Sequence, residues 1–401
     1  MNSRNNVWIE LGLWGSASFF CLMHHKDGSS WWQLISLWVL FFTLFLITKH
    51  RAAPTSGLLI VATFAVIGWL FMCRIDASLA LAHWQHWIAA SIAYLLALHI
   101  NWSDYNHKYL YGIFTLLILL ITVLIGVEIG GAKAWLNLGS LQFQPIEFAR
   151  VPLLLFLGGY FYDNQLLLRA SSRWPLLRYW GPMFLLMAGV FLFLGVQRDL
   201  GPALLFFAIF ITMSLYTAFS WHSAAIYLSI GILGVMVGWF QFTHFQQRVW
   251  VWLNPWMYEH SLGYQILQGL FALNAGGVFG TGLGYGRGLL IPEVHTDYIF
   301  ALIGEEFGLV GATLVLLLYL TLLFWIVKIS AYTSDKGHLL AIGVMLLWGF
   351  QVFLVVAGIL KLIPLSGMTL PFISYGGSSL MANMWLLGII TSLGVKRNVC
   401  V

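Results

Sequence analysis

The feature that most constrains this chain is a series of apolar segments, each close to the length that crosses a lipid bilayer. A membrane-spanning helix needs about 20 apolar residues. Backbone polar groups have no water partner in lipid, so each segment is predicted to be helical. The sequence therefore predicts an all-α integral membrane protein, a polytopic helical bundle. About twelve such segments lie roughly at 7–24, 31–48, 57–73, 79–100, 109–127, 147–161, 179–196, 201–219, 222–243, 298–327, 338–360 and 372–394.

The composition supports this fold and argues against a nucleic-acid partner. Of the 401 residues, 60% are hydrophobic and 8% are charged, whereas a soluble domain carries about 25% charged residues. The net charge of +5 comes from 19 Lys and Arg against 14 Asp and Glu. No basic cluster is dense enough to indicate nucleic acid, so membrane lipids are the expected surroundings of the bundle.

Lysine and arginine gather in the short loops on one side of the predicted bundle. Cytoplasmic loops of membrane proteins carry an excess of these residues. This side is therefore predicted to be cytoplasmic, together with both ends of the chain. The residues concerned are Lys49, Arg51, Arg169, Arg173, Arg178, Lys328, Lys336, Lys396 and Arg397.

Four segments fall on the opposite, outer side: 128–146, 197–200, 244–297 and 361–371. The third is far longer than the tight turns elsewhere, and long connections of this kind are usually functional or disordered. It is rich in Gly, Trp and Tyr, which favours ordered structure, such as re-entrant helices that line a cavity.

The outer side also holds twelve of the scarce charged residues, six acids and six bases. Such residues are expensive near a membrane and usually face a cavity or a partner. Acids and bases gathered on one face beside a membrane suit an anionic amphiphile such as a lipid pyrophosphate. Glu305 and Glu306 lie inside an apolar segment, where pairing with arginine is the structural alternative. The outer acids are Glu128, Glu147, Asp199, Glu259, Glu293 and Asp297, and the outer bases are Lys133, Arg150, Arg198, Arg248, Arg287 and Lys361.

The outer segments carry distinctive motifs in a fixed order. The first holds Gly131-Ala-Lys-Ala-Trp135 and then Gln144-Pro-Ile-Glu147, and the second is Gln197-Arg-Asp199-Leu-Gly-Pro-Ala203. The third runs from Arg248 through Gly263-Tyr-Gln265 and the glycines at 276–284 to Pro292-Glu-Val-His295-Thr-Asp297. The fourth begins at Pro364 and leads into Leu370-Pro-Phe-Ile-Ser374-Tyr-Gly-Gly-Ser378-Ser379.

Together these motifs resemble the SEDS family, the RodA/FtsW/SpoVE proteins of shape, elongation, division and sporulation, over residues 57 to 397. The resemblance implies a ten-span core at 57–401, with residues 1–56 as additional N-terminal spans. It also implies an inverting peptidoglycan glycosyltransferase of the bacterial cytoplasmic membrane, which polymerises lipid II and works with a class B penicillin-binding transpeptidase. The chain departs from the usual family residues at Ala134, Ile146, Arg150 and Val355.

Asp297 is the candidate catalytic residue, because it matches the aspartate that the family requires. Forming the glycosidic bond needs a base that takes a proton from the acceptor hydroxyl. A carboxylate shielded by apolar walls has a raised pKa, which makes it a better base. The alternative is that Asp297 caps the helix predicted to begin near Tyr298, since Asp favours that position.

Arg248 and Arg150 are candidates for the departing pyrophosphate, because guanidinium groups bind phosphate bidentately. Lys133 is a further candidate, and a bound Mg²⁺ or Mn²⁺ could share the role. Glu147 is a candidate substrate contact, but it lies three residues before Arg150, so an intrahelical ion pair explains both residues equally well. Asp199 is read as the cap of the following helix.

Three further residues are predicted to touch the substrate. Trp135 could stack on a sugar or anchor the protein at the membrane interface, as tryptophans commonly do. His295 could orient a ligand or hydrogen-bond its own loop, and Gln265 belongs to the third motif. The small residues from Ser374 to Ser379 are expected to permit close helix packing.

Two other functions stay open from the sequence. A transporter that flips lipid-linked precursors needs a polar path through the membrane, and Glu305 and Glu306 are its best support. A weakly catalytic scaffold that regulates a transpeptidase is the third possibility.

Overall fold

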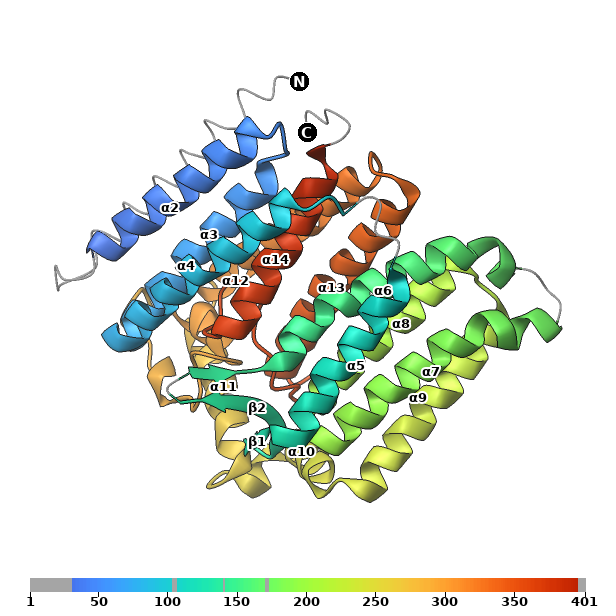
Figure 1. Cartoon of the computed structure of the whole chain (residues 1–401). Helices are drawn as coiled ribbons and strands as arrows, with labels where there is room; N and C mark the ends of the chain where they lie inside the picture. The colour runs from blue at the N-terminus through green and yellow to red at the C-terminus, as the bar shows by residue number, and fades with distance from the viewer. Residues whose placement is uncertain (1–30, 103–106, 140, 170–172, 396–401) are drawn as a thin grey trace.

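The computed structural model describes residues 31–102, 107–139, 141–169 and 173–395, so the predicted span at 7–24 lies outside the described residues. The described chain is a bundle of helices that run roughly alongside one another (Figure 1). The predicted all-α membrane fold is confirmed. The helices are α2 (Trp31–His50), α3 (Ser56–Ile75), α4 (Ala77–His99), α5 (Lys108–Ile125), α6 (Pro145–Arg169), α7 (Arg173–Gln197), α8 (Leu200–Thr217), α9 (Trp221–Gln241), α10 (Thr243–Leu253), α11 (Leu262–Gly276), α12 (Ile299–Ser330), α13 (Asp335–Ile359) and α14 (Gly377–Leu393).

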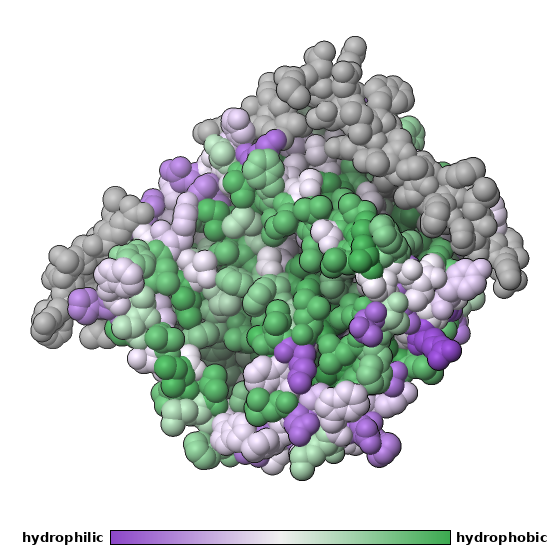
Figure 2. Space-filling model, turned by 180° about the vertical axis from the view of Figure 1, so that it is seen from behind, coloured by the Kyte–Doolittle hydropathy of each residue, from purple (hydrophilic) through white to green (hydrophobic). Residues whose placement is uncertain are grey.

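Eight of the described helices are long and apolar enough to cross a membrane: α2, α3, α5, α7 from Trp180, α8, α9, α12 and α13. The predicted spans at 79–100, 147–161 and 372–394 correspond to α4, α6 and α14. These three carry more polar residues or are shorter, and they pack against the others: α14 against α4, and α6 against α5 and α13. Large apolar side chains remain exposed on the outside of the bundle, and they cover much of the face in Figure 2.

Helix starts follow ordinary capping chemistry where the sequence supplies it. Asp76 accepts a hydrogen bond from the Ser78 N–H at the start of α4, as expected for an acid in a short turn between spans. Ser220 and Ser223 form a capping box at the start of α9. These side chains satisfy backbone N–H groups that the helix itself leaves unpaired.

The long third segment is ordered, as predicted. It forms α10, the 3₁₀ turn η2 (Pro255–Tyr258), α11 and the 3₁₀ turn η3 (Gly288–Leu290), and it ends at the start of α12. The Gln265 side chain on α11 donates to the Pro292 carbonyl at 3.0 Å. This bond joins α11 to the loop that leads into α12.

A small antiparallel sheet was not predicted. It consists of β1 (Val127–Ile129), β2 (Ala132–Leu138) and β3 (Leu141–Phe143), in the order β1-β2-β3. Val127 pairs with Trp135, and Leu136 pairs with Phe143. The sheet connects α5 to α6, so it lies at the end of the bundle where the other outer motifs also gather.

Helix α12 is interrupted at Gly308, which has φ 66° and ψ −167°. The glycine-rich segment bridges the break. The Thr281 and Gly282 N–H groups donate to the carbonyls of Glu305 and Glu306, while Leu309 and Val310 donate to the carbonyls of residues 277 and 278. A glycine is needed at 280, because an added β-carbon would lie 2.2 Å from the Glu306 carbonyl oxygen. The glycine motif therefore completes the hydrogen bonds of a broken helix.

The sheet, the α7–α8 turn, residues 243–298 and residues 360–376 all meet at one end of the bundle, here called the motif end. Contacts between them confirm this: the Trp252 indole donates to the Lys361 carbonyl at 3.0 Å, and the Gln144 N–H donates to Ser378 Oγ at 3.1 Å. At the opposite end, Lys108 and Lys336 both pair with Asp163, at 2.7 and 3.3 Å.

Candidate functional site

Asp297 lies in the loop immediately before α12, at the motif end. Thr296 Oγ1 donates to Asp297 Oδ1 at 3.2 Å. Burial raises the pKa of the Asp297 carboxyl to about 6; hydrogen bonds from its own N–H and Thr296 oppose the shift, nearby Glu293 adds to it, and Arg248 lowers it. A base with a pKa near neutrality accepts protons more effectively than an ordinary aspartate.

The helix-capping alternative for Asp297 is wrong. Helix α12 begins at Ile299, and Tyr298 occupies its N-cap position. Asp297 precedes the cap, and its carboxylate is engaged by Thr296 instead.

Arg248 lies on α10, and only one nitrogen of its guanidinium is hydrogen-bonded to the described residues. Its Nη1 donates to the Leu365 and Ser366 carbonyls at 3.2 and 3.3 Å. Among the described residues these are its only hydrogen bonds, so the edge formed by Nη2 and Nε is free of them. Arg248 also feels the charges of Asp199 and Asp297. The structure thus places Asp297, the predicted base, and Arg248, the predicted pyrophosphate-binding residue, close enough for their charges to interact.

Glu147 and Arg150 form a buried ion pair on the first turns of α6, so the intrahelical alternative is confirmed. Arg150 Nη2 donates to Glu147 Oε1 at 2.7 Å, and Arg150 Nη1 donates to Gln351 Oε1 at 3.1 Å. Gln351 in turn donates to the Thr369 carbonyl at 2.8 Å. With its side chain 1% exposed, Arg150 supports the site from within rather than presenting a free guanidinium.

Asp199 is a site residue that sequence reasoning underrated. It occupies the N-cap position of α8, as predicted, but its side chain makes no capping hydrogen bond. Its Oδ2 is buried and has no hydrogen-bond partner among the described residues. Burial raises its pKa to about 6, Arg248 and Arg150 oppose the shift, and Glu147 adds to it. The one signal in the sequence was its place in an outer motif.

We call these five residues — Glu147, Arg150, Asp199, Arg248 and Asp297 — the charged group. They come from α6, the α7–α8 turn, α10 and the loop before α12. Their charges influence one another. The group combines two carboxylates of raised pKa with an arginine that has a free edge, which suits an anionic substrate and a proton transfer.

The other predicted residues lie around this group. His295 is on the Asp297 loop, with Nε2 3.7 Å from Glu293 Oε2, and Gln265 is attached to the same loop. Lys133 donates from β2 to the Val123 carbonyl at 2.8 Å, and Trp135 is a partly exposed residue of the same strand. None of the described interactions of Lys133 or Trp135 joins them to the charged group.

Glu305 and Glu306 belong to a second arrangement of buried charge. Glu306 Oε1 accepts from Arg74 Nε at 3.1 Å, and Glu305 Oε1 accepts from the Arg287 N–H at 2.7 Å. Arg74 also donates to the carbonyls of Gly284 and Gly286. Pairing with arginine is therefore confirmed for Glu306, and both acids secure the segment beside the break in α12.

A divalent cation has no evident set of ligands here. Among the described residues, no group of three or more His, Cys, Asp and Glu could hold a metal ion. The acids of the charged group come from three separate elements and do not converge in that way.

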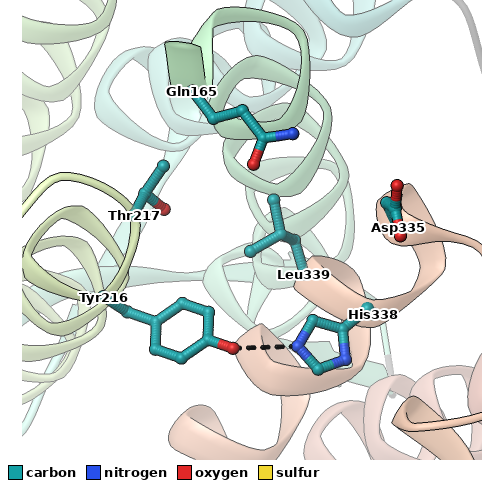
Figure 3. A pocket seen from close by; sticks show the side chains of 6 residues that line it. All are labelled: Gln165, Tyr216, Thr217, Asp335, His338 and Leu339. Carbon is teal, nitrogen blue, oxygen red and sulfur yellow. Dashed lines mark hydrogen bonds between the residues drawn. The ribbon is translucent and has the colours of Figure 1, made fainter. Parts of the chain in front are cut away.

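A polar pocket of about 510 Å³ is lined by side chains of α6, α8 and α13, which Figure 3 shows from close by. It lies at the end of the bundle opposite the charged group. Its Tyr216 hydroxyl and His338 Nε2 are 2.9 Å apart. Because α8 and α13 reach the motif end only at their other termini, this pocket is separate from the candidate site. The lining residues are Gln165, Tyr216, Thr217, Asp335, His338 and Leu339.

Comparison with known proteins places these features in context. Residues 44–399 match the model of a cell cycle protein family that comprises FtsW, RodA and SpoVE. The peptidoglycan glycosyltransferase RodA of Mycobacterium bovis is 32% identical over 95% of this chain and 88% of that protein. The stage V sporulation protein E of Bacillus subtilis is 31% identical over 74% of this chain and 80% of that protein.

A solved structure has the same fold. It is described as showing structural coordination of polymerization and crosslinking by a peptidoglycan synthase complex. Its matching chain superposes with a TM-score of 0.72 at 27% identity, over 86% of this chain and 98% of that one.

Proposed function

This chain belongs to the FtsW/RodA/SpoVE family of cell cycle proteins, and from that premise we propose that it is a peptidoglycan glycosyltransferase that polymerises lipid II with Asp297 as its base. Lipid II is a disaccharide peptide linked to undecaprenyl pyrophosphate. The observation that carries the proposal is the charged group, in which a carboxylate of raised pKa and a guanidinium with a free edge share the motif end.

The chemistry assigns one role to each of the two residues. Asp297 takes the proton of the acceptor hydroxyl while the oxygen of that hydroxyl attacks the anomeric carbon of the donor sugar. The bond from that carbon to the pyrophosphate oxygen breaks, its electron pair stays on the pyrophosphate, and the configuration inverts. The free edge of Arg248 binds the developing negative charge, since charge-assisted guanidinium–phosphate bonds are strong. Lipid pyrophosphate then leaves.

The remaining predicted residues have supporting roles in this proposal. Arg150 and Glu147 set the electrostatic surroundings of Asp199 and, through it, of Arg248. His295 and Gln265 hold the loop that carries Asp297. Trp135 and Lys133, on the neighbouring sheet, would meet the more distant parts of the substrate.

We also propose an orientation in the membrane and a partner protein. The charged group faces the outside of the bacterial cytoplasmic membrane, and both termini are cytoplasmic, as the lysine and arginine pattern predicts. A class B penicillin-binding transpeptidase is the proposed partner, supported by the similarity to a chain from a complex that coordinates polymerization and crosslinking. Residues 57–401 would form the enzyme core, and residues 1–56 the additional spans.

The transporter alternative loses its best support, because Glu305 and Glu306 are both tied to neighbouring residues rather than open to a path. Purified protein supplied with lipid II decides the question on a gel of glycan products, with and without divalent cations. We expect polymer from the wild type and at least about 10²-fold less from Asp297→Asn. Scrambling of labelled lipid II without polymer would establish the transporter instead.

The scaffold alternative needs a separate assay. Asp297→Asn should lose its support of growth while it still co-purifies with the transpeptidase. If the variant supports growth normally, the protein acts as a scaffold and its proposed catalytic role is wrong.

A further inference from the structure

His86, on α4, lies against the segment that precedes α14. A β-carbon added at Gly377 would be 2.7 Å from His86 Cδ2, so only a glycine lets the imidazole approach this closely. The His86 ring is also 5.2 Å from the ring of Tyr375, measured between centroids. Neither contact could be predicted from the sequence, where 288 residues separate His86 from Tyr375 and none of the outer motifs includes α4.

Tyr375 connects His86 to the loop of the proposed base. The Tyr375 N–H donates to the His295 carbonyl at 2.8 Å. The rings of Tyr375 and His295 meet edge to face, with centroids 5.5 Å apart and planes at 65°. His295 lies two residues before Asp297. One backbone bond and one ring contact therefore fix this loop to Tyr375.

A second histidine strengthens the support beneath Tyr375. His83, one turn before His86, is fully buried, and its Nε2 accepts a hydrogen bond from the Trp87 indole at 3.1 Å. Its ring lies 6.4 Å from that of Tyr375. The chain thus places two imidazoles of one helix near the same tyrosine, which also contacts the Asp297 loop.

His86 is not what simple packing would select at this position. Its Nδ1 is buried and has no hydrogen-bond partner among the described residues, and such a group costs stability unless it serves another purpose. A phenylalanine or leucine would fill the space without that cost. The unpaired Nδ1 therefore plays no part in the contacts with Gly377 and Tyr375, which depend on the size and position of the ring.

We propose that His86 is a positioning residue for glycosyl transfer, which acts through Tyr375 to hold the 293–297 loop and hence Asp297 in place. The inference rests on the proposed function. Misplacing a reacting group by about 1 Å can cost on the order of 100-fold in rate. Removing the imidazole lets Tyr375 move into the vacated space, and the loop moves with it.

The test compares four variants in the polymerisation assay with purified full-length protein and lipid II. His86→Ala removes the ring, and His86→Phe replaces it with a ring of similar size. Gly377→Ala pushes the imidazole away while leaving Tyr375 unsubstituted. His99→Ala is the matched control, because His99 is exposed at the far end of the same helix. We expect kcat to fall about 10-fold to 100-fold in His86→Ala and Gly377→Ala, and to stay within about threefold of wild type in His86→Phe and His99→Ala.

A pH–rate profile separates positioning from general destabilisation. Burial is the main cause of the raised pKa of Asp297, so a loop that opens to water brings this pKa back toward its ordinary value. The acid limb of kcat/KM should therefore move to lower pH in His86→Ala and Gly377→Ala, and should stay in place in His86→Phe. General loss of folded protein lowers the amplitude without moving the limb.

Two results overturn the inference: wild-type rates in both His86→Ala and Gly377→Ala, or slow variants whose acid limb is unmoved. Where His86→Ala does not fold, Gly377→Ala alone gives the answer. Asp297→Asn is measured alongside. No polymer from the wild type rejects the proposed function itself, and wild-type rates in Asp297→Asn reject the role of Asp297 as base. A slow Asp297→Asn with fully active His86→Ala and Gly377→Ala rejects only the role of His86.

Discussion

Asp163 at one end of the bundle and Asp199 and Asp297 at the other have opposite surroundings. At one end, Asp163 is shared by Lys108 and Lys336, at 2.7 and 3.3 Å, and its side chain is 32% exposed. At the motif end, neither Asp199 nor Asp297 has an ion pair within 4.0 Å among the described residues, and burial raises the pKa of both. Paired, solvated charges stabilise a loop, whereas unpaired, shielded ones stay available for a substrate.

The largest expected effect comes from removing the proposed base. Asp297→Asn should lower polymerisation about 10² to 10⁴-fold, the usual contribution of general base catalysis, because an amide cannot accept the proton. The rate of glycan formation from lipid II measures this. Glu259→Gln, at an exposed acid of the same end outside the charged group, serves as control and should polymerise normally.

Arg248→Lys should have the next largest effect. A lysine keeps the charge but not the planar fork, and hydrogen bonds to charged groups contribute about 1.5–3 kcal/mol, so we expect a loss of about 10-fold to 100-fold in kcat/KM. Arg287→Lys is the matched control, because the Arg287 side chain is exposed and only its backbone N–H holds Glu305. Equal rates in the two variants would show that the Arg248 guanidinium does not bind the leaving group.

The pH profile should follow Asp297. The base works only when deprotonated, and its pKa is raised to about 6. The value of kcat/KM should therefore be constant above about pH 7 and fall about tenfold for each unit below pH 6. Asp199→Asn checks the assignment, because Asp199 has a similarly raised pKa. Disappearance of the acid limb in that variant would assign the titration to Asp199 instead.

The smallest effect belongs to the opposite end. Asp163→Asn removes the partner of two lysines, but exposed ion pairs typically contribute about 0–1 kcal/mol. We expect a small decrease in thermal stability, read from a melting curve in detergent, and unchanged polymerisation. A loss of activity without a loss of stability would contradict the view that Asp163 only stabilises its end of the bundle.

Hydropathy predicted the bundle well because lipid demands a helix wherever the chain crosses it. The predicted segment at 57–73 became α3 at Ser56–Ile75, and 338–360 became α13 at Asp335–Ile359. The same reasoning missed the sheet at Val127–Phe143, because strands this short leave little periodic signal between glycines. It also assigned Asp199 a capping bond, since local preference takes no account of the arginines that tertiary structure brings near.

The pattern of apolar segments was enough to establish that this chain is a membrane protein and to locate its long helices, and it singled out the few charges that are too costly to be incidental. The sequence also pointed to Asp297 and Arg248 through their motifs. The folded structure was needed to choose the ion pair with Glu147 over substrate contact for Arg150. It was also needed to show that Asp199 stays unpaired and that His86 reaches the Asp297 loop through Tyr375. Hydropathy can be read segment by segment along the chain, whereas the burial and pairing of a charge depend on neighbours that only folding brings together, such as Gln351 beside Arg150.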